Sequence, residues 1–328
     1  MHKRKINETI KSYESRLWQK RKEYGLSEDD IQNLISDEIY KKTMSERAIK
    51  TGERPDLEFD NSVMIINDVH LPFERDDVID VVAQHNDEIT HLVIAGDLLD
   101  VKSISFFPKL EDWTLEQEMA YAHTWLTELR GVLTNNQPII LINGNHEERW
   151  LREIHNLRQK HFQKFMNPNL IEVLIDGFEL FHDRFGYEVS YYPPIENMVF
   201  IPHWFINMDN RLIIAHPRSF SQVDGKMCEN TVAHFMNRGE EFDVVVFGHT
   251  HKYSQMTVSR RGGKYAVENG CMCKPQEYVD SGRLNFTPQH YCYTIIKWDT
   301  GDRIDYNNIR VYHLEEDTEP IDVNFEFE

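Results

Sequence analysis

Five short apolar runs in this sequence each end in residues that could bind a metal ion. The runs cover residues 63–66, 92–95, 138–142, 212–215 and 244–247. The polar blocks that follow them read D-x-H from Asp68, G-D-x-x-D from Gly96, G-N-H-E from Gly144, a single His216, and G-H-x-H from Gly248. The candidate donors are carboxylate or amide oxygens and imidazole nitrogens, without a cysteine, and this mixture suits divalent manganese, iron or zinc.

The elements that must position these donors are buried strands. Apolar runs of this length predict strands, and an open α/β sheet places its chemistry at the carboxyl ends of its strands. Residues 76–86 and 115–133 have the apolar spacing of helices between ligand-bearing strands, which predicts a mainly parallel central sheet covered by helices. Later strands, which we expect to complete a second sheet, are predicted at residues 255–258, 264–268, 291–298 and 309–313.

In this order, the five blocks resemble the motifs of the calcineurin-like metallophosphoesterase superfamily, over roughly residues 61–300. The resemblance implies a metal-dependent phosphoric ester hydrolase with the α/β fold of that superfamily, a four-layer α/β/β/α sandwich with two central mixed sheets. It also implies two divalent ions, with manganese expected first and iron or zinc as the alternatives. Two such ions, about 3.5–4 Å apart, activate a bridging hydroxide as the nucleophile and neutralise charge on the phosphoryl oxygens.

The resemblance assigns a ligand set as well. Two dications at that spacing repel each other strongly, so a carboxylate must bridge them, and we expect Asp97 in this role. The other ligands are divided between two sites, with Asp68, His70 and His251 at one and Asn145, His216 and His249 at the other.

His146 has a different expected role. In the superfamily pattern, the histidine of G-N-H-E does not bind metal but reaches the leaving-group oxygen as a general acid. Asp100, the last residue of the G-D-x-x-D block, occupies the position of a carboxylate that would hold the His146 ring and favour its protonated form. Glu147 is expected to have a structural role at the turn.

Two departures from relatives bear on the substrate. Serine/threonine phosphatases of the superfamily clamp a phosphomonoester dianion with an arginine after G-D-x-x-D and another before G-N-H-E. Here Val101 and Lys102 follow the first block and Asn143 precedes the second, so both arginines are absent. The candidate substrate-binding replacements are Lys102, Arg149 and Arg218. Because a phosphodiester carries one negative charge and needs less clamping, the sequence favours a phosphodiesterase.

The expected substrate is therefore a nucleotide or nucleic-acid phosphodiester, which includes the substrates of nucleases. The alternative is a phosphomonoesterase acting on proteins or nucleotides. A non-catalytic protein-binding scaffold is a third reading, but it predicts eroded ligand positions, and here every ligand position is filled.

The chain divides into three expected parts. Residues 1–55 form a helical N-terminal arm, because apolar residues recur at helical spacing on either side of Gly25. Residues 61–313 form the metallophosphoesterase domain, within which residues 150–210 are expected to cap the active site. Residues 314–328 form an acidic tail without a basic residue.

Charge and composition limit the remaining choices. The 328 residues carry 36 basic and 55 acidic side chains, a net charge of −19, which disfavours non-specific nucleic-acid binding by the whole chain. Residues 1–22 are the exception, with eight lysines and arginines against two glutamates. No apolar run is long enough to span a membrane. The four cysteines form no CxxC pair, and with no secretion signal we expect a cytoplasmic protein of unknown oligomeric state.

Overall fold

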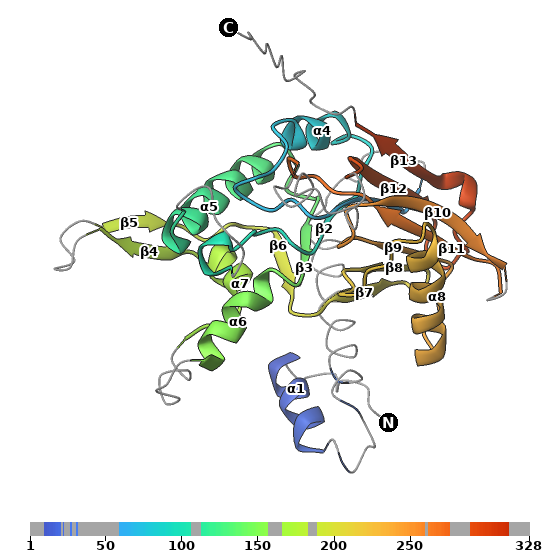
Figure 1. The fold of residues 1–328 in the computed structure, drawn as a ribbon, viewed down its shortest axis with the longest axis horizontal. Coiled ribbons are helices and arrows are strands. Elements are labelled where there is room, and N and C mark those ends of the chain that lie inside the picture. Colours follow the sequence, from blue (N-terminus) through green and yellow to red (C-terminus); the bar gives the residue numbers. More distant parts are fainter. Residues whose placement is uncertain are drawn as a thin grey trace, which may run out of the picture.

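The computed structural model describes residues 10–20, 22, 27, 31, 59–105, 113–156, 166–182, 189–259, 262–275 and 289–314. Two sheets form the centre of the molecule (Figure 1). The first sheet contains, in order, β13 (Ile309–His313), β12 (Cys292–Trp298), β1 (Asn61–Ile66), β2 (His91–Ala95), β3 (Ile139–Ile142) and β6 (Met198–Ile201). The second contains β10 (Tyr253–Val258), β11 (Lys264–Asn269), β9 (Val244–Phe247), β8 (Leu212–Ala215) and β7 (Phe205–Met208).

The ligand-bearing strands run parallel in both sheets. In the first sheet, β1, β2, β3 and β6 are parallel neighbours, and β12 and β13 extend the sheet in antiparallel pairing. In the second sheet β8 pairs with β9 in parallel, and β7 and β10 lie antiparallel at the edges. The carboxyl ends of β1, β2 and β3 therefore meet at one edge of the first sheet, and those of β8 and β9 meet in the second.

Alternation of side chains along each strand builds the layers. Val63 and Ile65 of β1 pack between the two sheets, against residues of the second sheet such as Ile214. Met64 and Ile66 point the other way, into the core between the first sheet and its helices. Both faces of the first sheet are thus buried, which explains why its strands read as continuous apolar runs in the sequence.

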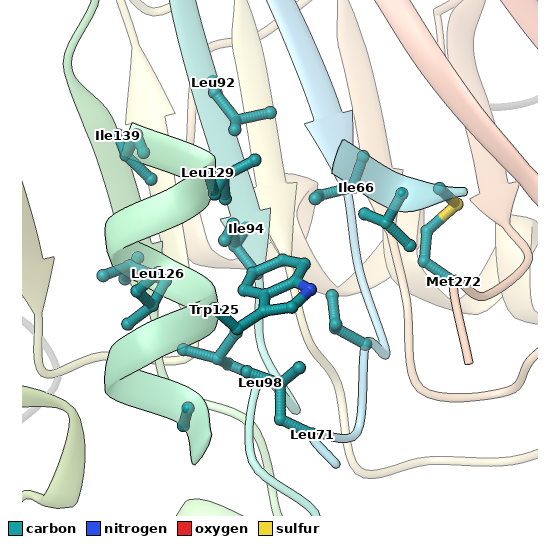
Figure 2. Close-up of a cluster of buried hydrophobic side chains, with 14 of the residues drawn as sticks. Ile66, Leu71, Leu92, Ile94, Leu98, Trp125, Leu126, Leu129, Ile139 and Met272 are labelled. Carbon is teal, nitrogen blue, oxygen red and sulfur yellow. The ribbon is translucent and has the colours of Figure 1, made fainter. Parts of the chain in front are cut away.

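Helices α4 (Val78–Gln84), α5 (Leu115–Gly131) and α7 (Leu170–Asp176) cover the outer face of the first sheet. Helix α5 begins at a capping box in which Thr114 and Gln117 satisfy each other's backbone amides. Its buried side presents Trp125, Leu126 and Leu129 to β2 and β3 (Figure 2).

Helix α8 (Lys226–Arg238) covers the outer face of the second sheet, where Phe235 packs against Ala215 and Phe247. The layers therefore follow the order α/β/β/α, as the resemblance implied. Helices α4 and α5 lie where the sequence predicted them.

One expectation about the later strands was wrong. We expected all four strands after His251 to complete the second sheet, but only β10 and β11 do so. Strand β12 pairs antiparallel with β1 and carries β13 with it into the first sheet. The alternation of Ile295 toward the helices and Ile296 toward the sandwich interior suits a strand buried on both sides, and a sequence pattern cannot tell which of two sheets such a strand joins.

We expected residues 150–210 to cap the active site, and the structure describes most of this segment. Strands β6 and β7 belong to the two central sheets. The rest of the described segment contains the end of α6 (Glu147–Asn156), α7, and a hairpin of β4 (Phe178–Phe181) and β5 (Val189–Tyr192), which extends to one side of the molecule (Figure 1).

The expected N-terminal arm and acidic tail lie mostly outside the described residues. Of the arm, helix α1 (Ile10–Gln19) is described. None of the helices in the described part of the chain is long and apolar enough to cross a membrane.

Candidate metal centre

All nine residues predicted as ligands or catalytic groups come together where the two sheets end. They follow five strands: Asp68 and His70 follow β1, Asp97 and Asp100 follow β2, Asn145 and His146 follow β3, His216 follows β8, and His249 and His251 follow β9. The first sheet supplies all the carboxylates, and the second supplies three of the imidazoles. The centre therefore depends on the stacking of the sheets as well as on the strand ends.

Asp97 lies between two groups of donors. Its carboxylate is within 4.8 Å of the nitrogens of His216 and His249 in one group, and of Asp68 and His70 in another. The Oδ1 atom accepts a hydrogen bond from the backbone N–H of His146 at 2.9 Å. The Oδ2 atom faces Nε2 of His216 at 3.1 Å and Nε2 of His70 at 3.9 Å. This placement is what a carboxylate that bridges two ions requires.

The two carboxylate oxygens of Asp68 also have different partners: one accepts hydrogen bonds and the other faces a histidine. Oδ2 accepts hydrogen bonds from the backbone N–H of His249 at 2.8 Å and from the side chain of Asn67 at 2.6 Å. Oδ1 is fully buried without a hydrogen-bond partner and faces Nε2 of His251 at 3.2 Å. A buried, unpaired carboxylate oxygen is costly, and a cation beside Oδ1 would satisfy it.

In His216 and His70, Nε2 faces the carboxylate of Asp97, and Nδ1 contacts a group farther from the centre. Nδ1 of His216 donates to the carbonyl oxygen of Ala95 at 2.8 Å, and its Nε2 faces Asp97. Nδ1 of His70 lies 3.0 Å from Oδ1 of Asp100. Such outer hydrogen bonds fix the tautomer and orientation of histidines that bind metals.

His146 is held by Asp100 as expected, but Asp100 holds a second ring as well. Nδ1 of His146 donates to the carbonyl oxygen of Asp100 at 2.8 Å and lies 3.1 Å from its Oδ1. The same Oδ1 contacts His70. On the other side of the ring, Arg149 donates from Nη2 to Nε2 of His146 at 2.8 Å.

The backbone at the centre has unusual conformations. Five of the predicted ligands have positive φ angles: Asp68, His70, Asp97, His249 and His251. Val101, directly after Asp100, is also left-handed at φ 50°, which is an outlier for a β-branched residue. Non-glycine residues persist in this region only where the surrounding structure enforces it, and they concentrate at functional sites.

Glycines in the motifs make room for the ligands. A Cβ added to Gly144 would lie 2.0 Å from Oδ1 of Asp97, and one added to Gly248 would lie 2.5 Å from Oδ2 of Asp68. Gly96 has φ +82°, and a Cβ there would lie 2.5 Å from the ring of His216. The glycines of these three blocks are therefore needed for the close approach of a side chain from another strand's end.

The electrostatics of the centre favour positive charge. Burial lowers the pKa of His216, but Asp97 and Asp68 outweigh burial and raise it to about 9. Burial also lowers the pKa of His70, yet hydrogen bonds to Asp100 and Asp68 raise it to about 10. The buried carboxylates thus draw protons onto these rings, and a divalent ion would supply the same charge. The donor set fits two such ions.

The imidazole of His146 has a lowered pKa. Burial lowers its pKa and outweighs the opposing effect of Asp97, and nearby cations, including Arg149, act in the same direction as burial. The contact with Asp100 acts in the opposite direction, to raise the pKa of His146, but it does not outweigh burial.

The sequence model of the calcineurin-like phosphoesterase family matches residues 62–253. The chain belongs to this family. It is accordingly a metal-dependent phosphoric ester hydrolase of the dinuclear kind. The matched segment runs from β1 to the start of β10 and contains every predicted ligand.

No curated protein matches this phosphoesterase in sequence. Among solved structures it is similar to a metallophosphoesterase from Sphaerobacter thermophilus, with 11% identity over 78% of this chain and 89% of the other, and a TM-score of 0.38. It is similar to Vps29 from Chaetomium thermophilum, with 10% identity over 80% and 100% of the two chains and a TM-score of 0.35. A serine/threonine phosphatase from Saccharomyces cerevisiae has 12% identity over 88% and 91%, with a TM-score of 0.38.

The three candidate substrate-binding cations of the phosphoesterase have different positions. Arg149 lies at the centre, on His146. Arg218 forms an ion pair with Glu148 beside it. The Lys102 ammonium lies 4.5 Å from the ring centroid of Phe73.

Two further residues support the centre. The sequence predicted a structural role for Glu147 but gave no indication of Gln289. Glu147 accepts from the backbone N–H of Leu99 at 3.0 Å and of Gly144 at 2.9 Å, so it ties together the loops after β2 and β3. The amide of Gln289 lies 2.9 Å from Nδ1 of His251. Gln289 belongs to no motif and approaches from a segment far along the chain, so its sequence carries no signal of this contact.

Proposed function

We propose that this phosphoesterase hydrolyses phosphodiesters of nucleotides or nucleic acids, with two divalent ions, manganese first among them. The observation that supports a diester is that, among the described residues, few of the candidate cations lie at the metal centre. Of the three candidates, only Arg149 contacts a catalytic residue. Arg218 is paired with Glu148, and Lys102 packs on Phe73. One arginine suits a single negative charge.

The proposed ligands follow the two groups around Asp97. Asp68, His70 and His251 hold one ion, Asn145, His216 and His249 hold the other, and Asp97 bridges them. Bound ions supply a water of lowered pKa and neutralise charge that develops on the phosphoryl oxygens.

The proton for the leaving group comes from His146 in this proposal. Arg149 now occupies Nε2, and Nδ1 is committed to the carbonyl of Asp100. An anionic phosphate is a better partner for a guanidinium than an imidazole nitrogen is. When Arg149 turns to the phosphate, Nε2 is free to take a proton from solvent and give it to the leaving oxygen, while Asp100 keeps the ring in place.

The second candidate is a phosphomonoesterase, which the position of Arg149 favours, because a guanidinium beside the general acid could also clamp a dianion. The size of the substrate is a separate choice within the first proposal. The basic residues 1–22 favour nucleic acid, and the acidic remainder of the chain favours a small nucleotide.

The deciding experiment compares manganese-dependent hydrolysis of bis(p-nitrophenyl) phosphate with that of p-nitrophenyl phosphate, with Asp97→Asn as the blank. The proposal expects faster turnover of the diester. Faster turnover of the monoester would overturn it in favour of the phosphatase. Binding of manganese without turnover of either would direct the search to larger natural diesters such as DNA and RNA.

A further inference from the structure

A pocket of about 540 Å³ lies beside the metal centre, and most of its lining residues have no part in the chemistry described so far. Its size is in the range of small-molecule sites. His216 forms part of its wall, together with Trp204, Glu148, Arg218, Asn230 and His234. Because Nε2 of His216 faces Asp97 at 3.1 Å, a group bound in this pocket lies next to any phosphate held at the centre.

Trp204 is a fixed aromatic wall of this pocket. Its indole stacks on Phe235 with ring centroids 5.4 Å apart, and it meets the edges of Phe205 at 4.9 Å and His234 at 5.5 Å. Its carbonyl oxygen accepts a hydrogen bond from the backbone N–H of His216 at 2.7 Å. The indole is therefore held in a set position relative to a proposed metal ligand, which reduces the entropy lost when a planar group stacks on it.

The polar groups of the pocket suit an uncharged ligand. Asn230 and His234 lie four residues apart on α8, both exposed, and so face the pocket from one side of that helix. An asparagine amide both donates and accepts hydrogen bonds. The charged residues, Glu148 and Arg218, are paired with each other. The wall therefore combines an aromatic surface with side chains that can donate and accept hydrogen bonds.

We propose that this pocket binds the nucleobase of the nucleoside that is esterified to the scissile phosphate. A base is planar, uncharged and edged with donors and acceptors, as the wall requires. Stacking of a base on an aromatic side chain contributes about 1–3 kcal/mol. This inference rests on the proposed phosphodiesterase function, because it assumes a nucleotide ester at the centre.

The first experiment uses two diesters with the same leaving group, thymidine 5′-(p-nitrophenyl phosphate) and methyl p-nitrophenyl phosphate. We expect the wild-type enzyme with manganese to prefer the thymidine ester by about 10-fold or more in kcat/KM. Trp204→Ala and Asn230→Ala should remove most of this preference, chiefly through KM, and leave the methyl ester within about twofold of wild type. Trp113→Ala, in a half-buried tryptophan of a different pocket, is the matched control and should change neither substrate.

Equal kcat/KM for the two esters in the wild type would overturn the proposal. A second result would also overturn it. If Trp204→Ala lowered kcat/KM equally for both esters and Asn230→Ala left the preference unchanged, Trp204 would only support His216. Asn230 is exposed on α8, so its substitution tests the pocket without risk to the core.

A binding measurement separates this inference from the proposed function. The phosphonate analogue of thymidine 5′-monophosphate, with a CH₂ group in place of the ester oxygen, is titrated calorimetrically against methylphosphonate in the presence of manganese. Binding of the nucleoside phosphonate about 10-fold tighter, and lost in Trp204→Ala, supports the pocket even if diesters prove to be poor substrates. Equal affinities overturn the pocket even if diester hydrolysis is confirmed.

Discussion

Arg149 donates a hydrogen bond from Nη2 to Nε2 of His146 across 2.8 Å. Its Nη1 donates to the carbonyl oxygen of Asp100 at 2.7 Å, so the guanidinium spans the proposed general acid and the residue that holds it. A lysine has a single ammonium and cannot make both contacts while also reaching a phosphate.

We therefore expect Arg149→Lys to reduce kcat/KM by about 10- to 100-fold, the value of a hydrogen bond to a charged group. Arg152→Lys, exposed on the same helix, is the control. Full activity in Arg149→Lys would show that the arginine does not touch substrate.

Asp97→Asn should abolish turnover and weaken the binding of both ions. Asparagine keeps the shape of the side chain and can still accept from the backbone N–H of His146 at Oδ1. It lacks the negative charge that two neighbouring dications require between them. Metal content after dialysis, measured by mass spectrometry beside the wild type, is the test. Retention of two equivalents by the variant would exclude Asp97 as the bridge.

His146→Ala should keep both metals and lose about 10²- to 10⁴-fold in kcat, the contribution of a general acid. Esters of good leaving groups, such as p-nitrophenol, need little proton donation, so their loss should be much smaller than that of alkyl esters. The measurement is a plot of log kcat against leaving-group pKa for wild type and variant. A parallel downward shift of the whole line, or loss of metal, would contradict the assignment.

Gly144→Ala should inactivate the enzyme although it adds one methyl group. The added Cβ would lie 2.0 Å from Oδ1 and 2.2 Å from the backbone nitrogen of Asp97, so strand β2 or the loop after β3 must move. Gly131→Ala is the matched control, because nothing lies within 4 Å of its Cβ position at the exposed end of α5. We expect that control to be fully active and slightly stabilised, by about 0.5–1 kcal/mol. Thermal unfolding and activity are measured for both.

Glu118 predicts a pH dependence of stability. Burial raises the pKa of this carboxyl to about 7, although Oε1 accepts from the backbone N–H of Ser103 at 2.8 Å. The carboxyl is neutral in both states below the unfolded pKa. As the pH rises, it ionises first in the unfolded chain, so stability falls up to about pH 7.

Glu118→Gln keeps the acceptor oxygen but cannot ionise. The variant should match the wild type near pH 4.5 and be more stable by about 1–3 kcal/mol at pH 8, from urea unfolding. Glu116→Gln, exposed on the same helix, should show no such pH-dependent gain. A constant difference across the pH range would mean that Glu118 is not protonated in the folded enzyme.

The strands that carry ligands were predictable because each is buried on both faces and ends in a polar block. The resemblance to the superfamily, and not the strand pattern, assigned Asp97 and His216 to one metal centre, although they are far apart in the chain and on different sheets. The sheet to which β12 belongs was not predictable, because an apolar strand such as Cys292–Trp298 fits either sheet. A contact set by tertiary packing, such as that of Gln289 with His251, also had no local signal.

The arrangement of the ligands on two sheets has a kinetic consequence. Asp68 and Asp97 belong to the first sheet, whereas His216 and His251 belong to the second, so an ion at the centre acts as a cross-link between the layers. Separation of the ends of the two sheets removes ligands from such an ion and so favours its release. The rate of isotope exchange between bound and free manganese would therefore report how often the sandwich opens, and amides at the ends of β2 and β8 should exchange hydrogen at a rate that falls as the ion is added.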